Sequence, residues 1–263
     1  MDNKFKANPY NSNNKLILEE DIINIFHKLN INDFKTNNIK LYQTAFVHKS
    51  YCQLSDYSDY KYPGKGFLEL QEDSYETIEF LGDSILGSII ASYIYRRFHC
   101  IHGENEGFLT KLKIRLVCGE YLAKLSKDFG LSEYIIISKH IEQNCDGRNN
   151  QNILEDVLEA FIGSLYLDKG YTYTENFIIK LIEEYCDFTE IILKDTNYKD
   201  QVSRYFQQTF NIYPKYNTVK YENIFKSSIY KNDILIETGS GISKKKAEQD
   251  VSRKALIHFN VIT

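Results

Sequence analysis

Long uncharged hydrophobic runs are missing from this 263-residue chain. No stretch of about 18 apolar residues, the length that crosses a bilayer, is free of charge. Residues 1–15 are polar, so we expect neither a membrane span nor a secretory signal. With 43% hydrophobic and 26% charged residues, the composition is typical of a globular protein with one large or two ordinary domains.

Closely spaced cysteine pairs are also absent, because the sequence contains no C-x-x-C motif. The cysteines are odd in number and far apart: Cys52, Cys100, Cys118, Cys145 and Cys186. This usage favours free thiols in a reducing compartment. We therefore expect an intracellular, cytoplasmic protein.

Positive charge is in deficit overall, with a formal net charge of −4, but it is unevenly distributed. Residues 195–263 contain 11 Lys and Arg against 7 Asp and Glu, whereas residues 1–194 contain 21 against 29. An acidic body followed by a basic segment is compatible with a metal-dependent enzyme that holds an anionic polymer. Charge alone does not establish that function.

Acidic residues interrupt one of the most apolar stretches, residues 75–93, which read YETIEFLGDSILGSIIASY. Positions three and four apart share a helical face, so Glu76, Glu79 and Asp83 form one stripe. Apolar residues cover most of the remaining circumference, which predicts a largely buried helix. No Lys or Arg lies three or four positions from Glu79 or Asp83, so positive charge must come from outside the helix.

A second stretch, residues 152–167, has the same character and reads NILEDVLEAFIGSLYL. Asp156 and Glu159 lie among apolar residues, with no cation within one helical turn. We expect the two helices to pack together so that these acids converge with Glu79 and Asp83; solvated surface acids are the alternative. An all-oxygen ligand set suits Mg²⁺, for which Mn²⁺ can substitute, rather than zinc.

The two stretches together resemble the signatures of the ribonuclease III family. Residues 76–86 are similar to its E-x-L-E-F-L-G-D-S-x-L motif, and residues 153–168 to its I-L-x-D-x-x-E-A-x-I-G-x-x-Y-L-D motif. Residues 47–51 resemble the family's T-H-x-S-Y segment, with Val47 in place of Thr. Residues 106–117 resemble E-G-x-L-T-x-L-R-x-x-L-V, with Lys113 in place of Arg.

This resemblance implies an all-α endonuclease domain and metal-dependent hydrolysis of double-stranded RNA to 5′-phosphate and 3′-hydroxyl ends. Glu79, Asp83, Asp156 and Glu159 would hold the metal directly or through water, and Glu76 would tune the site or bind substrate. Because the chain has one pair of acidic motifs, cutting both strands implies a homodimer. Phe80 and Leu81 would then lie at its interface or in the core of one subunit.

The remaining residues predict a small domain of order α-β-β-β-α: a helix over 198–210, strands over 216–222, 225–230 and 234–238, and a helix over 244–259. Residues 243–256, SKKKAEQDVSRKAL, resemble the last helix of the double-stranded RNA-binding domain. Lys244, Lys245 and Lys246 occupy its first turn, where backbone N–H groups and the helix dipole also favour anions. We expect them to contact RNA phosphates, although a lysine run is by itself only a solvated face.

Several departures from the family patterns are visible. Ser203 and Arg204 stand where many RNA-binding relatives carry Gln and Glu, and residues 222–224 are too few for the usual G-P-x-H loop, which predicts weaker or rearranged RNA binding. Residues 52–74 lengthen a connection that is shorter in compact bacterial members. They predict a disordered surface loop or an added contact with RNA or a partner. Residues 139–151 are expected to form a polar loop.

We therefore predict a multidomain chain, with a flexible N-terminus over residues 1–15, an all-α endonuclease domain over 16–194, and an α+β double-stranded RNA-binding domain over 195–263. The alternatives are a catalytically silent protein that sequesters double-stranded RNA and a structural protein of a ribonucleoprotein particle. The complete set of four carboxylates favours the nuclease, because a binding-only protein gains nothing from acids near phosphate.

Overall fold

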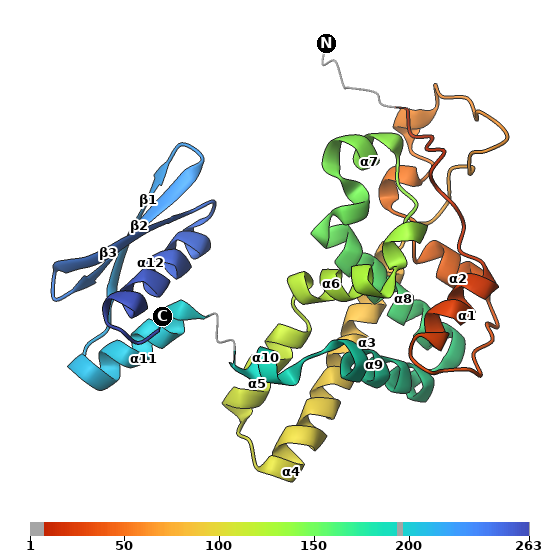
Figure 1. Cartoon of the computed structure of the whole chain (residues 1–263). Coiled ribbons are helices and arrows are strands. Elements are labelled where there is room, and N and C mark those ends of the chain that lie inside the picture. Colours follow the sequence, from red (N-terminus) through yellow and green to blue (C-terminus); the bar gives the residue numbers. More distant parts are fainter. Residues whose placement is uncertain (1–7, 194–196, 263) are drawn as a thin grey trace. The chain divides into compact units, whose positions relative to one another are not determined.

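The structure, a computed structural model, describes residues 8–193 and 197–262. It divides into two compact units, of which the first ends at Phe188 and the second begins at Thr189. The first unit is built from helices, and the second from helices packed on a small sheet (Figure 1). The predicted boundary between residues 194 and 195 lies outside the described residues.

The first unit has the predicted all-α architecture. Its helices are α1 (Glu19–His27), α2 (Ile39–Thr44), α3 (Glu76–Ile94), α4 (Cys100–His102), α5 (Glu106–Leu116), α6 (Gly119–Phe129), α7 (Lys139–Cys145), α8 (Gln151–Lys169) and α9 (Tyr171–Tyr185); α10 (Phe188–Leu193) spans the division between the units. Helix α8 is central and packs against α3, α6, α9 and α2. Its Phe161 contacts the rings of Phe26, Tyr42, Phe46 and Phe177, so an aromatic core surrounds the helix that carries the second acidic motif.

Helices α3 and α8 touch backbone to backbone at two glycines. A Cβ atom on Gly82 would lie 1.8 Å from the carbonyl oxygen of Glu159, and one on Gly163 would lie 2.3 Å from the carbonyl oxygen of Ile78. No larger residue fits at either point without moving a helix. Gly82 lies between Glu79 and Asp83 in the sequence. This contact therefore determines which part of α8 lies opposite the acids of α3.

Helix α3 is buried mainly over its second half. Leu86, Ile89 and Ile90 are buried, whereas Phe80 in the second turn is 75% exposed. The prediction of a largely buried helix is therefore wrong for its first turns. The difference arises because α8 crosses one side of α3 near Gly82, so apolar side chains on the other side find no cover within the first unit.

Helix α3 continues through a π-helical turn, Tyr95–His99, into α4 (Figure 1). The whole stretch, Glu76–His102, has 27 residues and a mean hydropathy of 1.2 in its most apolar window, which is sufficient by length and composition to cross a membrane. Packing against α8, α5 and α9 gives its apolar residues a different role, as part of the core of the first unit.

The segment before α1 is ordered over its described residues. The side-chain amide of Asn14 donates to the carbonyl oxygen of Ile137 at 2.9 Å, and its Oδ1 accepts from the N–H of the same residue. Tyr10 is buried. The prediction of a flexible N-terminus over residues 1–15 is thus wrong for residues 8–15, because short polar side chains supply hydrogen bonds that the polar composition concealed.

Two segments expected to be irregular also have defined structure. Residues 52–74 fold onto the body, where the Tyr51 hydroxyl donates to the carbonyl oxygen of Leu68 at 2.9 Å and the ring of Tyr62 packs against that of Tyr10, so the disordered loop is excluded. Residues 139–145, predicted as loop, form α7. Ser138 caps this helix by accepting a hydrogen bond from the N–H of Ile141, a start signal that the polar composition obscured.

The second unit has the predicted α-β-β-β-α order: α11 (Tyr198–Phe210), β1 (Lys215–Tyr221), β2 (Ile224–Lys231), β3 (Ile234–Gly241) and α12 (Lys244–His258). The strands form an antiparallel sheet of order β1-β2-β3. Both helices cover one face of the sheet, with Phe206, Ile229 and Val251 in the core. A Cβ atom on Gly239 would lie 2.4 Å from the backbone nitrogen of Val251, so a glycine lets α12 lie directly on β3.

The glycine contact between α3 and α8 predicts opposite effects for two glycines of one helix. Gly82→Ala should lower the free energy of unfolding by about 1–3 kcal/mol, because the added methyl group collides with the backbone of α8. Gly87→Ala is the matched control: its Cβ would meet only Lys113 Nζ at 3.9 Å, and alanine should add up to about 1 kcal/mol through helix propensity. Urea unfolding measures the stability of both variants. Equal free energies of unfolding for Gly82→Ala and Gly87→Ala would contradict the close approach of the two helices.

Candidate functional site

The predicted acids lie where α3 and α8 cross. Glu159 on α8 is the most buried of them, with 6% of its surface exposed. Glu79 on α3 and Asp156 on α8 are partly buried, and Asp83 on α3 is exposed. One side of this group is therefore embedded in the helix pair and the other opens to solvent.

The carboxylates repel one another across this crossing. Burial, together with the charges of Asp83, Glu155, Glu79 and Asp156, raises the pKa of Glu159 to about 8. Burial and the charges of Asp156, Asp83, Glu76 and Glu155 also raise the pKa of Glu79. Glu159 is consequently largely protonated at neutral pH when no cation is bound. The shifts show that side chains 70 or more residues apart in the sequence share one electrostatic site.

Tyr75 is a site residue that sequence reasoning did not identify. It is 2% exposed, and its hydroxyl donates a hydrogen bond of 2.9 Å to Oδ2 of Asp156. Burial raises the pKa of Asp156, whereas this hydrogen bond and the charge of Lys49 lower it. Tyr75 therefore fixes one oxygen of Asp156 and favours its ionised form. Only its position next to the acidic motif could have drawn attention to it.

Glu76 lies beside the other acids, at the start of α3. Its exposed carboxylate forms an ion pair of 2.9 Å with Lys49, in the short 3-10 turn Lys49–Tyr51. An exposed ion pair of this kind contributes little to stability. Its position next to the four inward acids fits the predicted supporting role of Glu76 and adds Lys49 as a cation beside the site.

The donor set fits a hard divalent cation. Within residues 8–193 and 197–262, no three His, Cys, Asp or Glu side chains are close enough in their present conformations to enclose an ion. Among these residues, however, no Lys or Arg forms an ion pair with Glu79, Asp83, Asp156 or Glu159, and the more distant charge of Lys49 acts on Asp156 without preventing the raised pKa values of Glu79 and Glu159. Carboxylate oxygens are the preferred ligands of Mg²⁺, and a bound cation would relieve that repulsion.

The second unit exposes the predicted lysines. Lys244, Lys245 and Lys246 are exposed in the first turn of α12, and Ser243 caps the helix by accepting from the N–H of Lys246 at 3.2 Å. No acidic residue of the described chain forms an ion pair with these lysines. Their ammonium groups are thus available to phosphates at a helix N-terminus.

The two predicted departures of this unit are also visible. The Ser203 hydroxyl donates to the carbonyl oxygen of Lys199, and Arg204 pairs with Asp200 at 3.2 Å, so neither side chain reproduces a Gln–Glu pair. β1 and β2 are joined by a tight turn of Glu222 and Asn223, with Glu222 at a φ of 49°. A turn of two residues is too short to take the place of the G-P-x-H loop, which would enter the groove of an RNA duplex.

The raised pKa of Glu159 predicts the pH dependence of stability without divalent cations. Its folded pKa, about 8, lies above the usual 4.5, so the folded chain keeps a proton that the unfolded chain loses. That stabilisation is complete below about pH 4.5 and is lost as the pH rises toward 8. Glu159→Gln should remove this decrease in stability. At pH 8 in EDTA, the free energy of unfolding of the variant should exceed that of wild type by on the order of 2 kcal/mol.

Thermal unfolding across this pH range measures the effect. Addition of Mg²⁺ at pH 8 should stabilise the wild type and have a smaller effect on the variant, because binding to the folded state adds to its stability. Parallel pH curves for the two proteins in EDTA would contradict the raised pKa.

Comparison with known proteins identifies both units. Residues 38–185 match the family model described as Ribonuclease-III-like, and residues 198–258 match the double-stranded RNA binding motif. "Ribonuclease 3" of Borreliella afzelii (strain PKo) is 32% identical over 235 residues, which cover 86% of this chain and 88% of that protein. "Probable ribonuclease 3" of Acanthamoeba polyphaga mimivirus is 41% identical over 203 residues, but this match covers 74% of this chain and only 36% of the longer viral protein.

A solved structure agrees with the sequence matches. The nuclease domain of ribonuclease III from Campylobacter jejuni, whose structure shows flexibility in a region involved in dimer formation, is 27% identical to this chain. It aligns with a TM-score of 0.50 over 63% of this chain and 98% of that domain. The family models that match both units, together with these relatives and the acidic helix pair, show that the chain belongs to the ribonuclease III family of endoribonucleases and carries a double-stranded RNA-binding domain.

Proposed function

We propose that this endoribonuclease depends on a divalent metal and hydrolyses phosphodiester bonds of double-stranded RNA to leave 5′-phosphate and 3′-hydroxyl ends. The observation that carries the proposal is the uncompensated group of carboxylates at the crossing of α3 and α8, which raises the pKa of Glu159 to about 8. Such repulsion costs stability, and a binding-only protein that approaches phosphate would be better served without it. For this reason the nuclease is preferred to a protein that only sequesters RNA.

Each acid has a role in this proposal. Glu79, Asp83, Asp156 and Glu159 would hold Mg²⁺ or Mn²⁺ directly or through water. The ion would supply a more acidic bound water and stabilise the charge that develops on the leaving 3′ oxygen. Tyr75 keeps Asp156 ionised and oriented through the hydrogen bond to Oδ2.

Basic side chains in each unit would contact the RNA. The Lys49–Glu76 ion pair is exposed next to the acids, where Lys49 can also attract a phosphate. In the second unit, Lys244, Lys245 and Lys246 bind phosphates of the duplex without reading its sequence.

We also propose that the enzyme works in a reducing intracellular compartment. All five cysteines are free thiols, which supports this proposal.

We further infer that the active form is a homodimer with Phe80 at the interface. Phe80 lies in the acidic helix, next to Glu79, yet 75% of its surface is exposed in the single chain. Burial of such a large exposed aromatic side chain against a partner subunit would stabilise the dimer, because it removes apolar surface from water. Leu81 is partly buried within its own unit and contributes less exposed surface. Two copies would provide the two carboxylate groups that cutting both strands requires.

The direct test of the nuclease is cleavage of an end-labelled RNA duplex of about 30 base pairs, long enough to span the site of one RNA-binding domain. Wild type should cut it with Mg²⁺ and not with EDTA. Glu159→Gln should lower the cleavage rate by at least about 100-fold while duplex binding in EDTA is retained, because a metal ligand is lost and the RNA-binding lysines are untouched. Binding without cleavage by the wild type would refute the enzyme and favour sequestration.

The homodimer is tested by placing a charge at the proposed interface. Phe80→Glu should convert the dimer to a monomer in sedimentation velocity, because an unpaired carboxylate would have to be buried. Tyr213→Glu is the matched control, since Tyr213 is a similarly exposed aromatic residue, at 69%, in the second unit. The control should remain dimeric. A dimer that survives Phe80→Glu would exclude Phe80 from the interface.

A further inference from the structure

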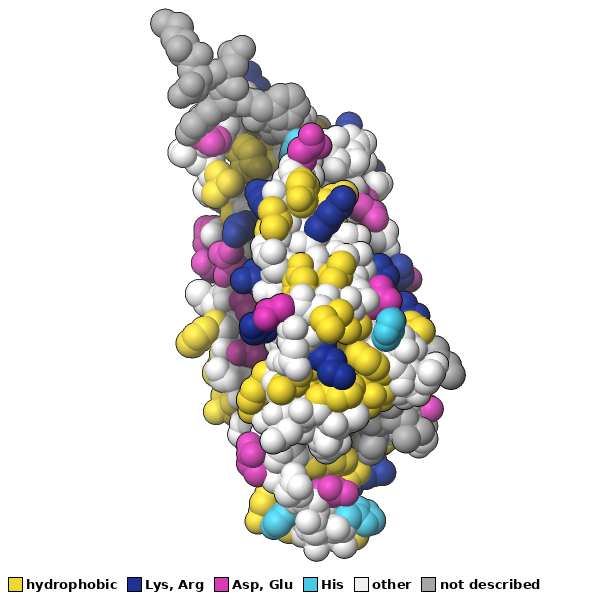
Figure 2. Space-filling model, turned by 90° about the vertical axis from the view of Figure 1, so that its left-hand side faces the viewer, with side chains coloured by type: hydrophobic (Ala, Val, Ile, Leu, Met, Phe, Trp, Pro, Cys, Tyr) yellow, Lys and Arg dark blue, Asp and Glu magenta, His cyan; other side chains and the backbone are white. Residues whose placement is uncertain are grey.

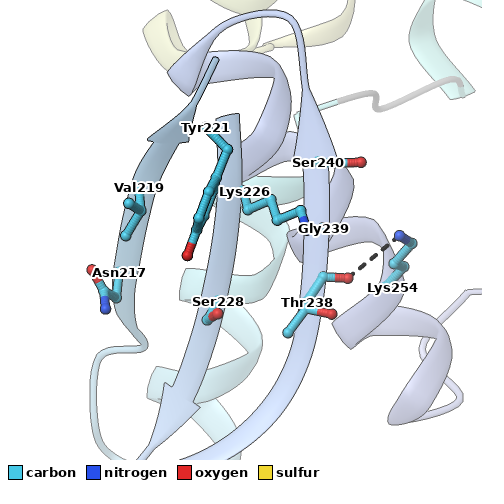
Figure 3. Close-up of a pocket in the computed structure, with 9 residues that line it drawn as sticks. All are labelled: Asn217, Val219, Tyr221, Lys226, Ser228, Thr238, Gly239, Ser240 and Lys254. Atoms are coloured by element: carbon cyan, nitrogen blue, oxygen red, sulfur yellow. Dashed lines mark hydrogen bonds between the residues drawn. The ribbon is translucent and has the colours of Figure 1, made fainter. Parts of the chain in front are cut away.

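The second unit has a sheet face that the helices leave uncovered. Side chains alternate along each strand, so Tyr216, Thr218 and Ser227 point toward α12, where Tyr216 bonds Ser252 and Thr218 bonds Glu248. Their neighbours point the other way. Around these outward residues lies a hollow of about 480 Å³, here called the outer face, which Gly239 lines with its backbone and which Lys254 of α12 reaches at the edge of β3. Its lining is Asn217, Val219, Tyr221, Lys226, Ser228, Thr238, Gly239, Ser240 and Lys254 (Figure 3).

One aromatic residue dominates the outer face. Tyr221, the last residue of β1, is 57% exposed, and its ring lies along the sheet surface rather than projecting from it (Figure 3). The ammonium group of Lys226 lies 5.2 Å from the ring centroid, an arrangement that holds the ring by a cation–π interaction. The tight turn at Glu222 and Asn223 follows directly, so no long loop folds back over the ring. The Tyr221 side chain is thus open to solvent on the sheet surface.

The charge and polarity of the outer face favour an anionic, hydrogen-bonding ligand. Two lysines and no carboxylate line the hollow. Lys254 is occupied by Asp250 at 2.9 Å and by the carbonyl oxygen of Thr238 at 3.3 Å, whereas Lys226 forms no ion pair with a described acidic residue. The hydroxyls of Ser228, Thr238 and Ser240 and the amide of Asn217 complete the lining. On the side of the molecule that Figure 2 presents, basic, acidic and hydrophobic side chains are interspersed.

We propose that the outer face binds unpaired nucleotides of single-stranded RNA, with a base stacked on Tyr221, the backbone phosphate beside Lys226, and base edges against the hydroxyl and amide groups. A flat sheet with an exposed aromatic ring, a free cation and short polar side chains is the chemistry that single-strand binders use. A protein partner would gain little here, because the lining contains one aliphatic side chain, that of Val219.

This site is separate from the lysines that bind the duplex. Lys244, Lys245 and Lys246 start α12, which lies on the covered side of the sheet, so one domain offers a duplex-binding helix end and a single-strand-binding sheet face. An RNA with a duplex and an unpaired flank or internal loop would engage both. The proposal concerns binding alone and does not depend on metal or cleavage.

The test measures binding of the full chain in EDTA by fluorescence anisotropy, with two probes: an unstructured RNA strand of about 10 nucleotides and a blunt RNA duplex. Tyr221→Ala should weaken binding of the strand by about 5- to 150-fold, the loss expected for one stacked base, and change duplex binding by less than about twofold. Tyr221→Phe should bind the strand like wild type, because stacking requires the ring and not the hydroxyl.

Lysine variants distinguish the two surfaces. Lys226→Gln should reduce the salt dependence of strand binding by about 0.7 in the log–log slope, the value for one phosphate contact on a single strand. Replacement of Lys244, Lys245 and Lys246 by Gln should weaken the duplex probe and leave the strand unaffected. Thermal unfolding of each variant confirms that the exposed substitutions leave the domain folded.

Three results would overturn the proposal. Wild type that does not bind the strand, or Tyr221→Ala that binds it as tightly as wild type, would exclude the outer face as an RNA site. A monomer–dimer equilibrium without RNA that Tyr221→Ala abolishes in sedimentation velocity would assign the face to a second copy of the chain instead.

Discussion

The close approach of α3 and α8 is the constraint on which the candidate site depends. Two glycines, Gly82 and Gly163, let the helices touch through their backbones, and the acids occupy the positions beside these contacts. Any side chain at Gly82 would separate the helices just where Glu79 and Asp83 face Asp156 and Glu159. A site of converging carboxylates needs this proximity, because a metal ion is held only by ligands within about 2–2.6 Å of it.

That proximity has an electrostatic cost that the rest of the unit offsets. Burial and repulsion raise the pKa values of Glu159, Glu79 and Asp156, so the site disfavours its own ionised state. The aromatic core around Phe161 fixes α8 independently of the charges, and Tyr75 favours the ionised form of one acid. Repulsion between the carboxylates is therefore compatible with a stable fold, and it is the feature on which the proposed binding of a divalent ion rests.

The double-stranded RNA-binding unit has two surfaces that we propose as contacts for RNA. The first turn of α12 presents exposed lysines at a helix N-terminus, a sequence-independent anion site. The turn between β1 and β2 is reduced to two residues, which removes one contact that related domains make with a duplex and leaves Tyr221 uncovered.

Local patterns in the sequence determined the order of the elements, the two acidic motifs and the lysines of α12, because periodicity, glycine breaks and motif spacing are local properties of the chain. Polar composition misled at residues 8–15 and 139–145, where Asn14 and Ser138 find hydrogen-bond partners that composition does not encode. Only the tertiary structure showed that Phe80 is exposed, that Tyr75 reaches Asp156 and that Tyr221 lies on an open face. These properties depend on which elements cover one another, and that is decided by long-range packing between residues far apart in the chain.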